Sequence, residues 1–266
     1  MKREYTFNVE QVTKDCIQWI RNWFEKNGPG CNAVLGLSGG KDSTIVAALC
    51  AEALGPERVI GVAMPDKGQG INEADKICKY LGIKYMFCPI DCVVAEFHKM
   101  WEYRGSDVEW SEQAEQNIPP RIRMTMLYAV SQTFNGRVAN TCNLSEDYVG
   151  YATLFGDNAG SFAPLSKLTV TEIYQIGDYL GLPYEWVHKV PDDGLPHSTS
   201  DEKKFGFSYA ELDRYIREGI EPEGKCNNSD ESKIDKIIRM HDNNQFKTDI
   251  VQIPCYWPIY NFEEYV

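Results

Sequence analysis

The first third of the chain alternates between two hydrophobic patterns. Apolar side chains at helical spacing predict a helix over Asn8–Asn27, which a glycine ends. A short, continuous apolar run over Cys31–Leu37 then predicts a strand that leads into a glycine-rich turn. A second, more uniformly apolar helix is expected over Thr44–Leu54, where a Gly-Pro pair ends it. The predicted order is therefore helix, strand, loop and helix.

The same alternation continues through the middle of the chain. Strands are predicted over Arg58–Met64, Ile83–Ile90 and Arg137–Thr141. Helices are predicted over Ile71–Leu81, Asp91–Trp101 and Pro119–Phe134, and a polar loop over Tyr103–Gln116. Apolar strands without polar alternation, separated by helices, indicate a parallel sheet that is buried on both faces. We therefore expect an α/β fold with an open, mostly parallel, twisted sheet and helices on both faces.

The periodicity weakens after residue 142. Helices are expected over Leu144–Ala152, Thr169–Leu180 and Asp230–Asn244, and a loop over Val190–Lys203, which is rich in Pro, Asp, Ser and Thr. The sequence contains no internal repeat and no low-complexity linker. We expect one α/β domain over residues 1–266, with a helical C-terminal extension that begins near residue 185.

Composition and charge exclude several classes of function. The chain is 43% apolar and 25% charged, which is typical of a packed globular protein. Its 27 basic and 39 acidic residues give a net charge of −12, which disfavours a nucleic-acid partner because phosphate backbones bind clustered Lys and Arg. An anionic ligand would need a local site and a metal ion.

Targeting and cysteine patterns point to a cytoplasmic protein. The longest stretch without a charged residue, residues 27–40, is shorter than the roughly 20 residues of a membrane-spanning helix, so no membrane partner is expected. The charged N-terminus does not resemble a secretory signal. The nine cysteines form no C-x-x-C pair and have no histidine at ligand spacing, so we expect reduced thiols, mostly in the core.

A glycine-rich loop after the first strand carries the strongest chemical signal. It reads Ser-Gly-Gly-Lys-Asp-Ser over residues 38–43, between a predicted strand and a predicted helix. In that position, backbone N–H groups and the helix N-terminus bind phosphate, and the serines add hydroxyl donors. The loop matches neither the P-loop nor the dinucleotide-binding pattern. The residues expected to contact ATP here are Gly36, Leu37, Ser38, Gly39, Gly40, Lys41, Asp42 and Ser43.

This loop resembles the signature of the N-type ATP pyrophosphatases, which split ATP between the α and β phosphates and adenylate an acceptor. A carboxylate beside a phosphate-binding loop would repel the bound phosphate. Asp42 is therefore expected to be a Mg²⁺ ligand. Three further segments resemble the NAD synthetases of this superfamily, with their adenine nucleotide alpha hydrolase-like fold. They are Asn117–Met124, Thr141–Glu146 with Phe155–Asp157, and Asp201–Tyr209.

The resemblance implies roles for individual residues. Glu146 would be the second Mg²⁺ ligand, Thr141 would contact ATP, and Asp157 would belong to a loop that closes over the reacting groups. Thr141 and Glu146 follow a predicted parallel strand, where open α/β sheets bind ligands. Arg121 would contact the dinucleotide, as would Phe246 and Lys247 near the C-terminus. The catalytic set implied is thus Asp42, Glu146 and Asp157.

Four positions depart from the pattern of the single-domain NAD synthetases. They are Leu154, Ser161, Val170 and Asp192, which replace a Lys, an acidic residue, a phosphate-binding Lys and a hydroxyl residue. Lys167 or Lys41 could supply the missing positive charge. The turn over Pro65–Gly68 resembles the adenosine-side loop of the family.

The resemblance implies a two-step reaction. ATP would adenylate the carboxylate of nicotinic acid adenine dinucleotide, and ammonia would then displace AMP to give NAD and pyrophosphate. The synthetase resemblance occupies nearly the whole chain, so we expect free ammonia, or ammonia from a separate partner, as nitrogen source and no glutaminase domain within these residues. The family is typically homodimeric. Two alternatives remain: an ATP pyrophosphatase with another acceptor, and a nucleotide-binding module without turnover.

Overall fold

A four-stranded parallel sheet forms the centre of the molecule. The computed structural model describes residues 3–66, 71–102, 108–188, 200–227, 229–250 and 253–258. The strands are β1 (Asn32–Gly36), β2 (Val59–Ala63), β3 (Lys84–Phe87) and β4 (Gly136–Val138). They follow the order β3-β2-β1-β4, and every neighbouring pair is parallel. The open parallel sheet expected from the sequence is confirmed.

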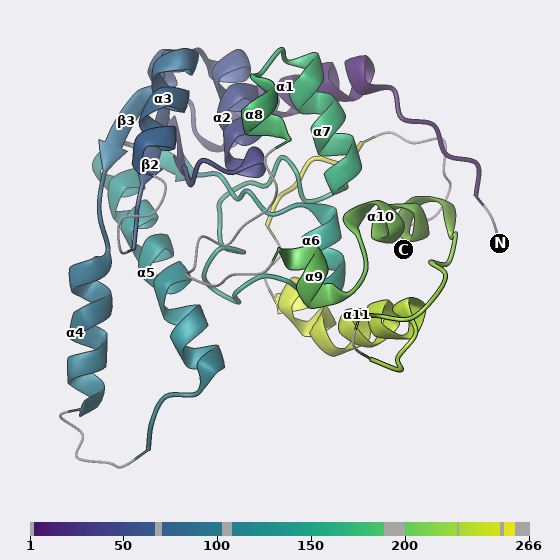
Figure 1. Cartoon of the computed structure of the whole chain (residues 1–266). Coiled ribbons are helices and arrows are strands. Elements are labelled where there is room, and N and C mark those ends of the chain that lie inside the picture. Colours follow the sequence, from purple (N-terminus) through teal and green to yellow (C-terminus); the bar gives the residue numbers. More distant parts are fainter. Residues whose placement is uncertain are drawn as a thin grey trace.

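Helices cover both faces of this sheet (Figure 1). One face packs against α1 (Val9–Asn27), α2 (Lys41–Leu54) and α3 (Ile71–Leu81), with a short 3₁₀ turn over Pro56–Arg58; the other packs against α4 (Asp91–Glu102) and α5 (Glu112–Thr133). In β1, Ala33 and Leu35 join the core on the first side, whereas Val34 packs with Ile122 and Val130 of α5. Because neighbouring strand residues point to opposite faces, both faces need apolar residues, which explains the uninterrupted apolar runs.

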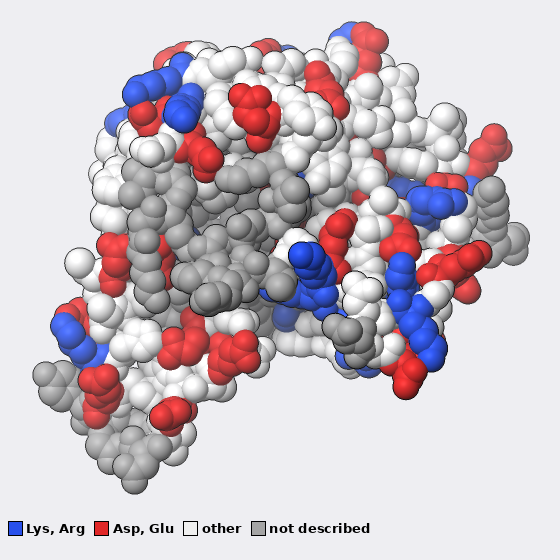
Figure 2. Space-filling model, in the orientation of Figure 1, with Lys and Arg blue, Asp and Glu red and all other residues white. Residues whose placement is uncertain are grey.

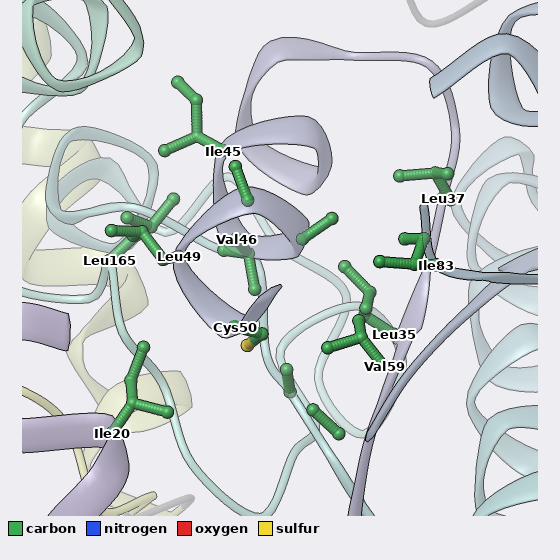
Figure 3. Packing of buried hydrophobic residues seen from close by; sticks show 14 of the residues in the cluster. Ile20, Leu35, Leu37, Ile45, Val46, Leu49, Cys50, Val59, Ile83 and Leu165 are labelled. Carbon is green, nitrogen blue, oxygen red and sulfur yellow. The ribbon is translucent and has the colours of Figure 1, made fainter. Parts of the chain in front are cut away.

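Helix α2 is buried on nearly all sides. Ile45, Val46, Leu49 and Cys50 pack between α1 and the sheet, as Figure 3 shows. A helix that is apolar all round is one surrounded by protein, which accounts for the weak amphipathic pattern of this segment. The first turn of α2 is therefore held by the densest part of the core.

Helix α5 begins earlier than the sequence pattern predicts. The expected loop over Tyr103–Gln116 is helical from Glu112 onward, because the Ser111 side chain caps the helix by accepting a backbone hydrogen bond at 3.2 Å. The two prolines that suggested the first helical turn lie inside the helix. Residues 103–107 lie outside the described residues.

Helices α4 and α5 lie side by side and extend away from the sheet (Figure 1). Their far ends are acidic in the space-filling view of Figure 2. The acidic residues there are Glu102, Glu112 and Glu115.

The C-terminal extension is helical, as expected, and contains more helices than the sequence pattern indicates. The helices after the sheet are α6 (Leu144–Val149), α7 (Val170–Tyr179), α8 (Tyr184–Val187), α9 (Asp201–Phe205), α10 (Tyr209–Glu218) and α11 (Lys233–Ile250). Some of them form a separate core, in which Val149 and Val170 pack with Leu212, Ile216 and Ile237, whereas Ile173 and Ile176 of α7 and Val187 of α8 join the core beside α1 and α2. No helix among the described residues is long and apolar enough to cross a membrane.

Three predictions in this region need correction. Lys203, expected in a loop, lies in α9, while residues 190–199 of that loop lie outside the described residues. Helix α10 was not predicted, although Ser208 and Glu211 form a capping box and Gly219 ends the helix in a left-handed conformation. The last helix begins and ends later than predicted. Charged residues alternate along this helix and its apolar residues are few, so the hydrophobic pattern is too weak to define the bounds of the helix.

Core packing gives a first prediction. Replacing the fully buried Ile20 of α1 with Ala should lower the free energy of unfolding by about 2–5 kcal/mol, because the lost methyl groups leave a cavity. The matched control is Ile238→Ala on α11, where the side chain is 43% exposed and the change should stay within about 0.5 kcal/mol. Urea unfolding followed by circular dichroism measures both, and equal losses would contradict the assignment of the core.

Candidate functional site

A cavity of about 530 Å³ opens at the carboxyl ends of the strands. Strand β1 contributes Gly36, β2 contributes Ala63, and β4 contributes Val138 to its lining. From β1 the chain passes to β2 on one side, and the connection from β3 crosses to β4 on the other side, so the strand order reverses at β1, which makes this the switch point where open α/β sheets bind ligands. Helix α5 supplies a further wall. Its lining residues are Pro120, Arg123, Met124 and Leu127.

The glycine-rich loop borders this cavity and is ordered by its own hydrogen bonds. Gly40 N donates to Ser38 Oγ at 3.2 Å, and the Gly40 carbonyl accepts from Ser43 Oγ at 3.1 Å. Gly39 has a φ of +83°, and a Cβ on it would lie 2.9 Å from Glu73 Cβ. Gly39 is therefore required for conformation, and it does not line the cavity. The other predicted loop residues, 36–38 and 40–43, do line it.

The start of α2 can accept an anion. The helix begins at Lys41, and no side chain hydrogen-bonds to its first turn from the cap position, Gly40. Its first backbone N–H groups thus lie beside the cavity, where the positive end of the helix dipole favours phosphate.

Two predicted carboxylates, Asp42 and Glu146, reach the same cavity. Asn143 connects them: its Nδ2 donates to Asp42 Oδ1 at 3.2 Å, and its backbone N donates to Glu146 Oε2 at 3.3 Å. The Asn143 side chain also accepts from Glu146 N, which completes a capping box at the start of α6. Burial and the nearby Asp42 carboxylate raise the pKa of Glu146 well above its usual range.

Lys41 lies against this acidic pair. Its Nζ is 2.8 Å from Asp42 Oδ2, and the side chain is only 5% exposed. The rings of Tyr174 and Tyr209 lie 5.9 and 5.8 Å from Nζ. Burial lowers the pKa of Lys41, but attraction to Asp42 and Glu146 outweighs it, so the pKa lies above its usual range and the ammonium stays charged.

The predicted residues Thr141 and Asp157 also line the cavity. Asp157 Oδ1 accepts from Thr153 N at 2.6 Å, and the Asp157 carbonyl accepts from Asn140 Nδ2 at 3.1 Å. These bonds fix the turn over residues 153–158 against the end of β4.

The three residues predicted to contact a dinucleotide lie outside the cavity lining. Arg121 donates from Nε to the Leu154 carbonyl at 3.2 Å, and Lys247 Nζ donates to the carbonyls of Gly150 and Ala152 at 2.8 and 3.1 Å. Phe246, on α11, is 51% exposed. Arg121 and Lys247 thus both contact the 150–157 segment, which contributes Tyr151, Gly156 and Asp157 to the cavity.

The structure adds residues that the sequence pattern did not indicate. Arg123 lines the cavity and donates from Nε to the Met64 carbonyl at 3.0 Å. Its helical spacing from Pro120 and Leu127 was the available signal, because the three share one face of α5. Tyr151 and Asp201 also line the cavity, and Tyr151 Oη donates to Asp201 Oδ1 at 3.0 Å. This hydrogen bond joins two segments that lie far apart in the sequence, so no local sequence pattern predicts it.

Three departures from the family pattern, Leu154, Ser161 and Val170, lie outside the cavity lining. Val170 is fully buried in the C-terminal core, and Ser161 Oγ accepts from Val138 N at 3.3 Å. Lys167 Nζ lies 4.6 Å from the centre of the Trp257 ring. Of the two lysines considered as replacements, Lys41 is the one that lines the cavity. Asp192 and residues 67–68 of the adenosine-side turn lie outside the described residues.

Comparison with known proteins decides the family. The NAD synthase family model matches residues 12–251. The chain belongs to the NAD synthase family.

Close relatives of this NAD synthase family member cover almost its whole length. It is 37% identical over 247 residues to the NH₃-dependent NAD⁺ synthetase of Archaeoglobus fulgidus, covering 91% of this chain and 96% of that protein. It is 34% identical over 254 residues to the corresponding protein of Carboxydothermus hydrogenoformans, covering 93% and 98%.

Solved structures are similar over the same length. An NMN synthetase from Francisella tularensis shares 26% identity with a TM-score of 0.81, covering 94% of this chain and 99% of that one. An NH₃-dependent NAD synthetase from Campylobacter jejuni shares 27% identity with a TM-score of 0.71, covering 93% and 99%.

In this NAD synthase family member, a buried polar network holds the C-terminal helices beside the site. Asp213 of α10 accepts from Ser145 Oγ at 2.5 Å and from Thr171 N at 2.8 Å. Arg217 of α10 forms two hydrogen bonds with Glu172, from Nε at 2.7 Å and Nη2 at 2.8 Å. Because Ser145 directly precedes Glu146, the network also positions α6 and its carboxylate.

Asp213 gives a pH-dependent prediction. Burial raises its pKa from 3.8 to about 6, so between these values the folded protein holds a proton that the unfolded chain has lost. This group's contribution to stability is therefore present below about pH 4 and is lost as pH rises through about 6. Asp213→Asn cannot ionise, so from pH 4 to pH 7 its unfolding free energy should rise relative to wild type, by up to about 3 kcal/mol.

Urea unfolding at several pH values measures this difference. Asp230→Asn is the matched control, since Asp230 is fully exposed, and its difference from wild type should change little with pH. A constant difference between Asp213→Asn and wild type would show that Asp213 does not titrate as its burial predicts.

Proposed function

We propose that the protein catalyses the ATP-dependent amidation of nicotinic acid adenine dinucleotide with ammonia, giving NAD, AMP and pyrophosphate through an acyl-adenylate. The observation that carries this proposal is the convergence of the Ser-Gly-Gly-Lys-Asp-Ser loop, Glu146 and Asp157 on one cavity at the strand ends. The family and the printed activity of its relatives support the same reaction. The family match over residues 12–251 supports a single catalytic domain.

The loop is proposed to hold the ATP phosphates. The N-terminus of α2 borders the cavity, and the Ser38 and Ser43 hydroxyls can reorient to donate to phosphate oxygens. Thr141 supplies another hydroxyl at the end of β4.

Asp42 and Glu146 are proposed to bind Mg²⁺. Two carboxylates joined by Asn143 fit this ion, because Mg²⁺ is commonly held by one or two carboxylates with water and substrate phosphates completing its shell. In the described part of the chain, no third His, Cys, Asp or Glu gathers with them as a metal cluster. When bound, Mg²⁺ supplies positive charge that stabilises the leaving pyrophosphate.

The chain's own residues orient the reacting groups. The substrate carboxylate attacks the α-phosphorus of ATP while the loop holds the pyrophosphate, so the main contribution is positioning with charge stabilisation. Ammonia then attacks the activated carbonyl and AMP leaves. Asp157, fixed by the Thr153 N–H, places a carboxylate where it can hold an ammonium ion and accept the proton that this ion loses to become the attacking ammonia. Arg121, Phe246 and Lys247 are proposed to contact the dinucleotide beside the 150–157 segment.

One observation favours a second acceptor. The NMN synthetase structure is similar with a TM-score of 0.81, against 0.71 for the NAD synthetase structure. The second candidate reaction is therefore amidation of nicotinic acid mononucleotide, with the same ATP chemistry and a smaller acceptor.

The first functional prediction concerns turnover. With ATP, Mg²⁺, ammonium and the dinucleotide, the protein should form NAD, AMP and pyrophosphate in equal amounts. Asp42→Asn and Glu146→Gln should each lower kcat by about 10²–10³-fold, since each removes transition-state charge stabilisation. Chromatography of the nucleotides with a pyrophosphate assay measures all three products.

The matched control is Asp230→Asn, an exposed carboxylate distant in sequence from the loop, which should keep wild-type turnover. A higher kcat/KM for the mononucleotide than for the dinucleotide would select the second acceptor. Pyrophosphate release with neither acceptor amidated would indicate another ATP pyrophosphatase, and ATP binding without turnover would indicate a nucleotide-binding module.

We also propose that the protein is a homodimer in the cytoplasm. All nine cysteines are free thiols, which a reducing compartment maintains. Helix α4 exposes an apolar stripe at helical spacing, formed by Val93, Phe97 and Met100, which are 40%, 43% and 66% exposed. An exposed stripe of this kind favours a protein partner. On α1, by contrast, the apolar side chains of Ile20 and Phe24 are buried in the core.

The dimer proposal predicts a change in mass. Phe97→Glu should convert the dimer to a monomer, because the charge would be buried unpaired in the interface. Ile238→Glu, an equally exposed apolar residue on α11, should leave the dimer intact. Sedimentation velocity distinguishes the species, and a monomeric wild-type protein would refute the proposal.

A further inference from the structure

Lys41 occupies a position that is unfavourable for a cation. It is the first residue of α2 and is only 5% exposed. The N-terminus of a helix carries a positive partial charge, so it repels an ammonium group, and burying the ammonium removes it from water. The packing of α2 does not require a buried lysine at this position, because the apolar residues of the helix follow later. The position is tolerated because anionic groups surround Lys41.

The charge of Lys41 is balanced by the carboxylates of the site itself. Nζ lies 2.8 Å from Asp42 Oδ2 and is attracted by Glu146. Tyr174 and Tyr209 present their rings to the ammonium from α7 and α10. The groups around Nζ are thus two carboxylates and two aromatic rings.

This arrangement competes with metal binding. Asp42 Oδ2 contacts Lys41, and Asp42 Oδ1 accepts from Asn143, so both oxygens of the carboxylate already have partners. A divalent cation on Asp42 and Glu146 would face the ammonium at short range, where like charges repel strongly. The Lys41 ammonium therefore cannot keep its present position beside the two carboxylates while a metal ion is bound to them.

We propose that Lys41 is an internal counter-ion, which neutralises Asp42 and Glu146 in the metal-free protein and turns to the phosphate chain when the metal–nucleotide complex binds. The four-carbon stem of a lysine allows such a movement, and its ammonium binds phosphate as a point charge. Lys41 and Arg123 are the basic residues of the cavity lining that the structure describes, and Arg123 is bonded to the β2 side through Met64. The inference rests on the proposed metal ligands and is independent of the acceptor.

The proposal predicts opposite effects on two ligands. In Lys41→Met, Mn²⁺ added without nucleotide should bind about tenfold more tightly than in wild type, because no ammonium has to be displaced. ATP with Mg²⁺ should bind about tenfold more weakly, because a phosphate contact is lost, whereas adenosine should bind as in wild type. Electron paramagnetic resonance of free Mn²⁺ and titration calorimetry of the nucleotides measure these affinities.

Controls separate this role from a structural one. Lys79→Met removes an exposed lysine that is paired with Asp75 and should change none of the affinities. Lys41→Arg keeps the charge and should bind Mn²⁺ no more tightly than wild type, which tests the idea even if Lys41→Met folds poorly. Equal or weaker Mn²⁺ binding in folded Lys41→Met would overturn the proposal.

The metal assignment is tested in the same series. Asp42→Asn should abolish Mn²⁺ binding, and unchanged binding would overturn both the assignment and the role of Lys41. NAD formation is measured separately with Mg²⁺, so failure of the proposed reaction and failure of this inference give different results.

Discussion

Electrostatic repulsion between two carboxylates is the constraint on which this site depends. Asp42 lies in the first turn of the buried helix α2 and Glu146 in the first turn of α6, yet Asn143 joins them at the end of the sheet. Burial and the Asp42 carboxylate raise the pKa of Glu146, whereas the Lys41 ammonium opposes that rise, so nearby positive charge stabilises the pair. The loop, the helix dipole and Lys41 all lie around this acidic pair, so the geometry of the site follows from the need to compensate it.

The parallel sheet supplies the rigidity that this arrangement requires. Strand β1 carries the glycine-rich loop, and β4 leads into the segment with Asn143 and Glu146. Since β1 and β4 are hydrogen-bonded neighbours, both segments leave the sheet at the same edge. The C-terminal helices then fix the far side of α6 through Asp213 and Ser145. The two carboxylates are thus held from two directions, by the sheet and by the extension.

Much of this could be predicted from the sequence, and the reasons are physical. Short continuous apolar runs between turns indicate strands covered on both faces, and the sequence of the loop after the first run indicates phosphate binding. The start of α5 escaped prediction because its first turns are polar and solvent-exposed. Arg123, Tyr151 and Asp201 escaped because they meet across segments far apart in the sequence. The roles of Arg121, Phe246 and Lys247 remain predictions, since these residues lie beside the cavity and not in its lining.

The near-complete burial of α2 restricts how this protein can diversify. A change in its apolar residues would move the first turn of the helix, which borders the cavity. Few substitutions should therefore be tolerated at these buried positions. Helix α5 and the 150–157 segment, which form walls of the cavity, touch the core less and carry exposed residues beside the cavity, such as Arg121 and Phe155. Substitutions that change the acceptor should therefore occur in those walls. The end of the cavity beside α2 should stay nearly unchanged in descendants of this chain.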